Sequence, residues 1–195
     1  LGDVYKRQNI DILTTENINI EDNIGTIGYN KKEFYGREHD FIALNTYDNF
    51  LSRWEVRKAI SYAIDKSSIV TSVYGGKYYT ADNPLDYGNW TFEQGSSSTG
   101  YNPDQAKQVL IDGGWSYKYG SWQKVENYKT IRLSINLTVN ADNSSQVAVA
   151  DIIKTSLENI GIKVNVSKLN SASFQTALNL SLIHISEPTR LQLIS

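Results

Sequence analysis

The sequence predicts an α/β fold, and two patterns of apolar residues carry that prediction. Residues 131–139 alternate between apolar and polar, as in a strand with one buried face, and apolar residues recur at helical spacing over 149–160. Gly161 can end that helix in a left-handed conformation, and the alternation resumes over 162–166. The sequence therefore predicts a βαβ unit at 131–168, with parallel strands joined by a right-handed crossover.

The second pattern is a pair of helices over 53–74, joined with almost no loop. Ser52 and Glu55 have the spacing of a capping box, in which each side chain bonds the other residue's backbone N–H. Leu51 and Val56 stand where a hydrophobic staple would close over that cap. Apolar residues then recur at helical spacing, so we expect one buried stripe along the first helix.

Polar residues and glycines mark the other boundaries. Asp65 is expected to cap the second helix of the pair, and Gly75-Gly76 to end it. Asn102 is expected to cap a third helix that has Pro103 at its first position and ends at Gly113-Gly114. The remaining expected elements are two short strands and one long ordered loop, at 10–13, 41–46 and 75–100.

Composition favours one globular lobe and excludes several functional classes. Of the 195 residues, 40% are hydrophobic and 21% charged, which is enough apolar sequence for a core. The net charge is −2 and the basic residues are dispersed, so we expect no nucleic-acid partner, which would need a basic face. There is no cysteine, and no apolar run is long enough to cross a membrane.

The sequence gives little support for catalysis. The two histidines, His39 and His184, have no identifiable catalytic partner, and no zinc-binding or nucleophile-elbow motif is present. Gly25 and Gly28 lack the third glycine of a dinucleotide-binding loop. We therefore expect no catalytic residue, no metal site and no cofactor.

Two longer motifs resemble a known family. Arg53-Trp-Glu-Val-Arg-Lys-Ala-Ile-Ser-Tyr-Ala-Ile-Asp-Lys-Ser-Ser-Ile-Val70 is similar to the signature helix pair of the family 5 extracellular solute-binding proteins. Tyr101-Asn-Pro-Asp-Gln-Ala-Lys-Gln-Val-Leu-Ile-Asp-Gly-Gly-Trp115 resembles a later helix of that family. The segment 41–46 before these motifs and the segment 160–164 after them occur in the same order as in the family. The resemblance covers roughly residues 9–180.

The resemblance implies a fold and a function. The fold would be part of one lobe of a type II periplasmic-binding-protein-like structure, with a mixed sheet and flanking helices. The function would be capture of a solute, most often an oligopeptide, by closure of two lobes, followed by delivery to the membrane permease of a bacterial ABC transporter. The protein would be a monomer in the periplasm, or a cell-surface lipoprotein held through an N-terminal anchor upstream of this fragment.

The two ends of the chain are expected to be foreign to the protein. Residues 1–8 and 181–195 resemble translated sequencing-adapter sequence of the kind found in metagenomic gene predictions. No methionine is present, so the natural start is expected upstream. The interpretation leaves residues 9–180 as the solute-binding part, a fragment that lacks half of the site.

The candidate ligand contacts are one amide and four phenol side chains. Asn45 and Tyr47 lie at the carboxyl end of the expected strand at 41–46, and ligands in open α/β sheets bind beyond the carboxyl ends of strands. An asparagine amide both donates and accepts, which suits a peptide backbone. The tyrosines of the long loop are candidate pocket residues, namely Tyr78, Tyr79 and Tyr87.

Alternatives remain open for both the site and the function. Asn45 can merely finish its strand, and the tyrosines can pack the loop. Arg57 and Asp65 read as structural, a helix-surface charge and a helix cap. The ligand can be an oligosaccharide or a nickel chelate, since fold does not determine ligand. The same lobe can also serve as the sensor of a transcriptional regulator, or belong to an enzyme whose catalytic residues lie elsewhere.

Overall fold

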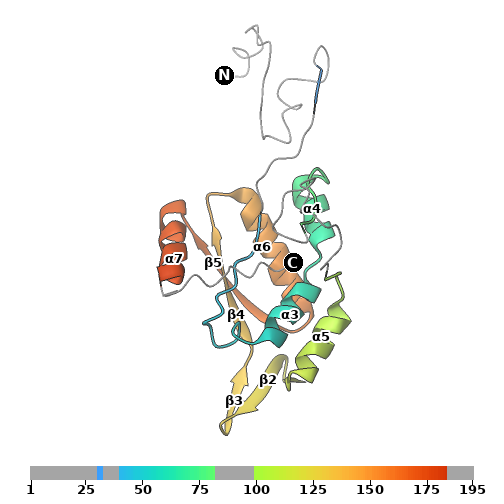
Figure 1. Cartoon of the computed structure of the whole chain (residues 1–195), viewed down its shortest axis with the longest axis vertical. Coiled ribbons are helices and arrows are strands. Elements are labelled where there is room, and N and C mark those ends of the chain that lie inside the picture. Colours follow the sequence, from blue (N-terminus) through green and yellow to red (C-terminus); the bar gives the residue numbers. More distant parts are fainter. Residues whose placement is uncertain (1–29, 33–39, 82–98, 184–195) are drawn as a thin grey trace, which may run out of the picture. The chain divides into compact units, whose positions relative to one another are not determined.

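A computed structural model describes residues 30–32, 40–81 and 99–183 of the chain (Figure 1). The chain divides into two units, Leu1–Arg37 and Glu38–Ser195, and the elements below belong to the second. Its helices are α3 (Trp54–Ala63), α4 (Lys66–Tyr74), α5 (Pro103–Asp112), α6 (Ser144–Asn159) and α7 (Ser171–Ile183). Its strands are β1 (Ser116–Lys118), β2 (Ser121–Glu126), β3 (Lys129–Arg132), β4 (Ser134–Asn140) and β5 (Lys163–Leu169).

The predicted βαβ unit is confirmed as β4–α6–β5. The two strands are parallel, from Ser134 opposite Lys163 to Asn140 opposite Leu169, and α6 packs against both of them. Asn143 caps the start of α6 by accepting a hydrogen bond from the backbone N–H of Gln146. Gly161 ends the helical segment at a φ of 90°, a conformation that L-residues with side chains rarely adopt. The expected α/β class is therefore correct.

The strand expected over 131–139 is in fact two strands. β1, β2 and β3 form a separate antiparallel sheet, and the chain passes from β3 to β4 at Leu133. The Leu133 backbone N–H bonds the Trp122 carbonyl, and the Leu133 side chain is buried. The alternation survives the junction because both strands keep their apolar residues toward the interior, so the sequence pattern alone does not reveal the break.

The helix pair forms as expected, but its first cap does not. Arg53 occupies the N-cap of α3 without a side-chain cap bond, and the Ser52 hydroxyl donates to the Asn49 carbonyl. Glu55 is buried and faces the Lys124 ammonium instead of turning back to Ser52. The capping-box prediction is therefore wrong, because the carboxylate has a cationic partner across the fold. Leu51 is buried in the core, as the staple would require.

The other predicted caps are confirmed. Asp65 accepts a hydrogen bond from the Ser68 N–H at 3.0 Å, and Gly75 ends α4 in the left-handed region. Asn102 accepts from the Gln105 N–H at 3.0 Å, with Pro103 at the first helical position. These bonds satisfy N–H groups that have no partner inside their own helix.

The expected strand at 41–46 does not pair with another strand among the described residues. The segment is irregular in hydrogen bonding, although Ile42 and Leu44 are partly buried against the core and Phe41 is exposed. The alternation therefore marks an extended segment that lies on the core, without a ladder. The expected strand at 10–13 lies outside the described residues.

One core joins the helix pair, α5 and the βαβ unit. Helices α3 and α5 pack on each other, and α6 adds its apolar face over β4 and β5. The best-buried large side chains come from four different elements or junctions, namely Val56, Leu110, Leu133 and Ile162. Among the described residues, no helix is both long and apolar enough to cross a membrane.

Candidate functional site

The structure places Asn45 and Tyr47 in a tight turn. The Asn45 side-chain oxygen accepts a hydrogen bond from the Tyr47 backbone N–H at 3.0 Å, and the Asp48 N–H bonds the Asn45 carbonyl at 3.1 Å. The side-chain oxygen of Asn45 thus stabilises the turn, as asparagine commonly does in turns. The Tyr47 ring is 64% exposed, so it remains available for contact.

A second candidate, Tyr78, belongs to a tyrosine cluster at the end of α4. Its ring centroid lies 4.5 Å from that of Tyr74, and the Tyr74 hydroxyl donates to the Asp40 carboxylate at 2.7 Å. Burial raises the pKa of Tyr74, and the hydrogen bond to Asp40 raises it further, so Tyr74 stays a donor. Tyr79, the next residue in the sequence, is about half-exposed. Tyr87 lies outside the described residues.

A small pocket lies next to the start of α4. Its volume is about 80 Å³, whereas pockets that enclose a small-molecule ligand usually hold several hundred. The walls come from the α3–α4 junction and from residues on both sides of the 82–98 segment, namely Ile64, Asp65, Lys66, Ser67, Thr80, Thr99, Gly100 and Tyr101. The pocket is too small for a dipeptide by itself.

A polar cluster that the sequence analysis missed lies at the carboxyl ends of β4 and β5. Asp142 accepts two hydrogen bonds of 2.7 Å from Ser171, one from its backbone N–H and one from its hydroxyl. These bonds, the hydroxyl first, hold the pKa of Asp142 below its usual range. The Asn140 side-chain oxygen also lies within hydrogen-bond distance of the Ser171 hydroxyl, and Asn170 caps α7 through the Ser173 N–H.

The available signal for this cluster was the position of its residues in the predicted βαβ unit. In open α/β sheets, ligands bind beyond the carboxyl ends of parallel strands. Asn140 is the last residue of β4, and Asn170 directly follows β5. The predicted βαβ unit therefore contained the signal, but the rule had been applied only to Asn45 and Tyr47.

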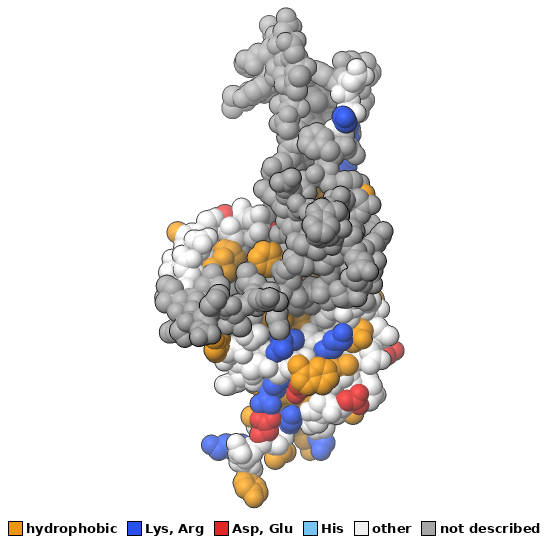
Figure 2. Space-filling model, in the orientation of Figure 1, with side chains coloured by type: hydrophobic (Ala, Val, Ile, Leu, Met, Phe, Trp, Pro, Cys, Tyr) orange, Lys and Arg blue, Asp and Glu red, His pale blue; other side chains and the backbone are white. Residues whose placement is uncertain are grey.

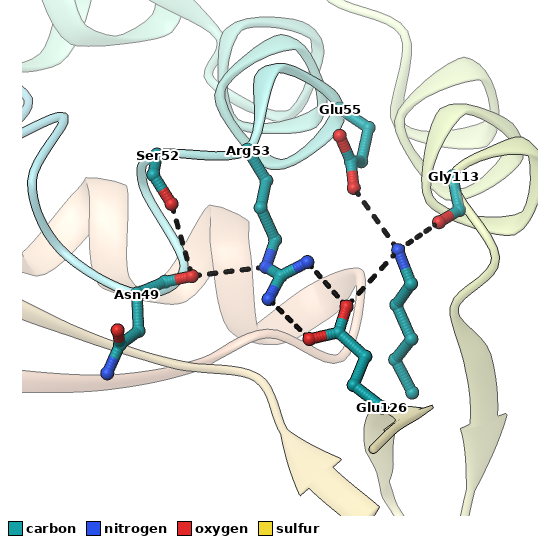
Figure 3. Close-up of polar contacts among 7 residues, drawn as sticks. Asn49, Ser52, Arg53, Glu55, Gly113 and Glu126 are labelled. Atoms are coloured by element: carbon teal, nitrogen blue, oxygen red, sulfur yellow. Dashed lines mark hydrogen bonds and ion pairs between the residues drawn. The ribbon is translucent and has the colours of Figure 1, made fainter.

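A network of ion pairs holds the β-sheet of β1–β3 against α3 (Figure 3). Two nitrogens of the Arg53 guanidinium bond the two Glu126 carboxylate oxygens at 2.6 and 2.7 Å, and Lys124 lies 3.6 Å from Glu126. Lys124 also donates to the Gly113 carbonyl at 2.9 Å and lies 3.7 Å from Glu55. The bidentate bond to Arg53 chiefly lowers the pKa of Glu126. The network positions the sheet and leaves no free carboxylate for a ligand.

Arg57 has a structural role, as its motif position suggested. Its guanidinium donates to the carbonyls of Leu51 and Ser52, both at 2.9 Å. These bonds close the turn that leads into α3. Within residues 30–32, 40–81 and 99–183, no three histidine, cysteine, aspartate or glutamate side chains gather as a metal site would need.

Comparison with known proteins identifies the family. The family model described as "Bacterial extracellular solute-binding proteins, family 5 Middle" matches residues 3–184. Heme-binding protein A of Haemophilus influenzae is 29% identical over 127 residues, which are 64% of this chain and 21% of the relative. The chain therefore spans about a fifth of that relative's length.

Two solved structures agree with the family match. The oligopeptide-binding protein AppA of Bacillus subtilis, in complex with a nonapeptide, superposes with a TM-score of 0.63 at 26% identity, covering 70% of this chain and 27% of that one. NikZ of Campylobacter jejuni, in complex with Ni(L-His), superposes with a TM-score of 0.61 at 26% identity, covering 67% and 26%. These neighbours have the type II periplasmic-binding fold, and the chain belongs to the family 5 bacterial extracellular solute-binding proteins.

Proposed function

We propose that this chain is part of an oligopeptide-binding protein that supplies a bacterial ABC transporter. The polar cluster at the carboxyl ends of β4 and β5 carries the proposal. Its amide, hydroxyl and carboxylate groups, on Asn140, Asp142, Asn170 and Ser171, are the kinds that pair with peptide N–H and C=O groups. Its place in the fold is the one where ligands of open α/β sheets bind.

Relatives that bind peptides support the choice of ligand. AppA is named for oligopeptides and its structure holds a nonapeptide. Other relatives are named for heme or nickel, which makes those ligands the alternatives to exclude. The function is binding without catalysis, as the family of transport proteins suggests.

The rest of the protein would complete both the site and the transport complex. Because the chain matches only 26% of AppA, much of the ligand-contacting surface would come from a second lobe. Closure of two lobes around the peptide would shift the protein toward the form that the permease accepts. We place the protein outside the cytoplasmic membrane, as a monomer in the periplasm or anchored upstream of this fragment, with residues 9–180 as the solute-binding part.

Titration calorimetry on the protein extended to its full gene tests the proposal. The probes are a mixture of peptides from three to nine residues, Ni(L-His) and heme, and we expect heat of binding from the peptides. Replacing Asn45, Tyr79 or Asp142 by Ala should weaken peptide binding, whereas Tyr119→Ala, at an exposed turn, should not. Binding of heme or Ni(L-His) without binding of peptide would contradict the proposal that the ligand is an oligopeptide. Unchanged affinity in all three variants would remove those residues from the site.

A further inference from the structure

The two turns of the β1–β3 sheet have an unusual backbone. Three non-glycine residues among those described have a positive φ, and all three lie in these turns: Tyr119 at 53°, Asn127 at 48° and Tyr128 at 62°. Each turn has two central residues, Tyr119-Gly120 between β1 and β2 and Asn127-Tyr128 between β2 and β3. A positive φ at both central residues is the geometry of a type I′ turn.

The tyrosines in these turns lower the stability of the fold. Type I′ turns prefer Asn-Gly because left-handed backbone is unfavourable for a residue with a side chain. Neither ring recovers that cost by burial, since Tyr119 is 95% exposed and Tyr128 is fully exposed. A strained backbone that presents a solvated aromatic ring is typical of a contact site rather than of a folding element.

The face of the sheet between these turns is basic. The register places Lys118 opposite Ser121 and Arg132 opposite Gln123, so both cations lie on the same face as the 71%-exposed Val125. Lys129, next to the Tyr128 turn, lies opposite Glu126 and therefore belongs to the other face. Neither Lys118 nor Arg132 forms an ion pair with a described residue.

The opposite face fixes the sheet to the rest of the fold. Trp122 is buried there and donates its indole N–H to the Ile160 carbonyl at 2.8 Å. Lys124 and Glu126 are on that same face, where Glu126 pairs with Arg53. The carboxylate of Glu126 is thus paired within the protein. Figure 2 shows basic, acidic and hydrophobic side chains close together at the end of the molecule where β2 and β3 lie in Figure 1.

We propose that the outer face of the β1–β3 sheet docks on an anionic lipid surface. Tyrosine, like tryptophan, is enriched at the level of the lipid headgroups, and nearby cations are attracted to anionic lipids. This face has a tyrosine turn at each end and two exposed cations, Lys118 and Arg132, that pair with no described acidic residue, which suits contact with an extended anionic surface. The site is separate from the proposed peptide site, and it would hold the protein close to the membrane.

Vesicle sedimentation of the 195-residue chain tests the proposal. We expect binding to vesicles of phosphatidylglycerol and phosphatidylcholine in equal parts, none to pure phosphatidylcholine, and release by added salt. Reversing the two cations of this face together, as Lys118→Glu and Arg132→Glu, should lower the bound fraction at least about tenfold. The same double reversal on helices α3 and α6, as Lys58→Glu and Lys154→Glu, is the matched control and should lower it less than about threefold.

A single variant separates docking from folding. Tyr128→Gly restores the preferred residue of the turn, so we expect equal or higher resistance to urea together with weaker vesicle binding. If Tyr128→Gly lowered both the resistance to urea and the vesicle binding, Tyr128 would have a role in folding. If it lowered neither, Tyr128 would not belong to the proposed docking surface. Equal binding to pure phosphatidylcholine, or equal loss in the helix control, would overturn the proposal. Release from the vesicles by soluble poly-glutamate at matched ionic strength would assign the face to an acidic protein instead.

Discussion

The most informative stability prediction concerns Trp122, which ties the β1–β3 sheet to the βαβ unit. Its side chain is 3% exposed, its indole N–H bonds the Ile160 carbonyl at 2.8 Å, and its ring lies 5.3 Å from that of Tyr117. Replacing Trp122 by Phe keeps an aromatic ring but removes the donor. The Ile160 carbonyl, at the end of α6, would then be left without this partner in a dry environment.

The expected cost has two parts. Leaving a buried acceptor unpaired costs about 1–3 kcal/mol. The smaller ring leaves unfilled space, which adds about 1 kcal/mol of lost apolar burial and packing. We therefore expect Trp122→Phe to lower the free energy of unfolding by about 2–4 kcal/mol, a large part of the stability of an ordinary domain.

Urea unfolding followed by far-ultraviolet circular dichroism measures this cost. The midpoint should fall without a change in the slope, because the surface exposed on unfolding is nearly the same. Trp54→Phe is the matched control: that ring is 63% exposed, so its replacement should change the free energy by less than about 0.5 kcal/mol. Equal midpoints for the two variants would refute the view that Trp122 anchors the sheet.

Three further predictions follow from single contacts. Gly161→Ala should cost at least about 2 kcal/mol, because φ is 90° and the added Cβ would collide with the Tyr117 ring; a thermal melt within a degree or so of the parent would contradict this. Asp65→Ala removes the cap bond to the Ser68 N–H and should cost about 0.5–2 kcal/mol in urea unfolding, and no loss would show that the cap is dispensable. The pKa of Glu126 is lowered in the folded state, so its ionised form stabilises the fold. This contribution to the free energy of unfolding is present above the unfolded pKa of about 4.3 and is lost as the pH falls through the lower folded pKa. Glu126→Gln should therefore flatten the acid side of the stability curve, and parallel curves would rule out this contribution.

Local sequence signals predicted the elements whose boundaries depend on one side chain or one glycine. Asp65 and Asn102 cap their helices because each side chain reaches the N–H three residues ahead. Gly161 ends the α6 segment because few other residues tolerate its backbone. Such features are decided within a few residues, so they are visible without the rest of the fold.

Features that depend on distant partners were not predictable from the sequence. Glu55 failed to close its capping box because Lys124, far along the chain, lies beside it. The β1–β3 sheet was missed because its turns carry Tyr119-Gly120 and Asn127-Tyr128 in place of the Asn-Gly or Asp-Gly that usually signals a hairpin. The segment at 41–46 alternates like a strand, but whether an extended segment joins a sheet depends on a partner strand.

The candidate site was predicted only in outline for the same reason. Asn45 was chosen from its position at the end of an apparent strand, and in the structure its side-chain oxygen accepts a hydrogen bond in a turn. The pairing of Asp142 with Ser171 joins residues far apart in sequence and required the parallel arrangement of β4 and β5 to be seen. Asn45, Tyr47, Tyr78, Tyr79 and Tyr87 remain predictions as ligand contacts.

Native mass spectrometry of the protein, extended at both ends from its genomic locus and purified without added ligand, tests the central claim most directly. An oligopeptide-binding protein should carry a ladder of added masses, which tandem fragmentation resolves into short peptides. We expect that ladder to weaken in the Asp142→Ala variant. A single added mass corresponding to heme or to a nickel chelate, or a genomic locus that joins this sequence to a DNA-binding domain, would contradict the account.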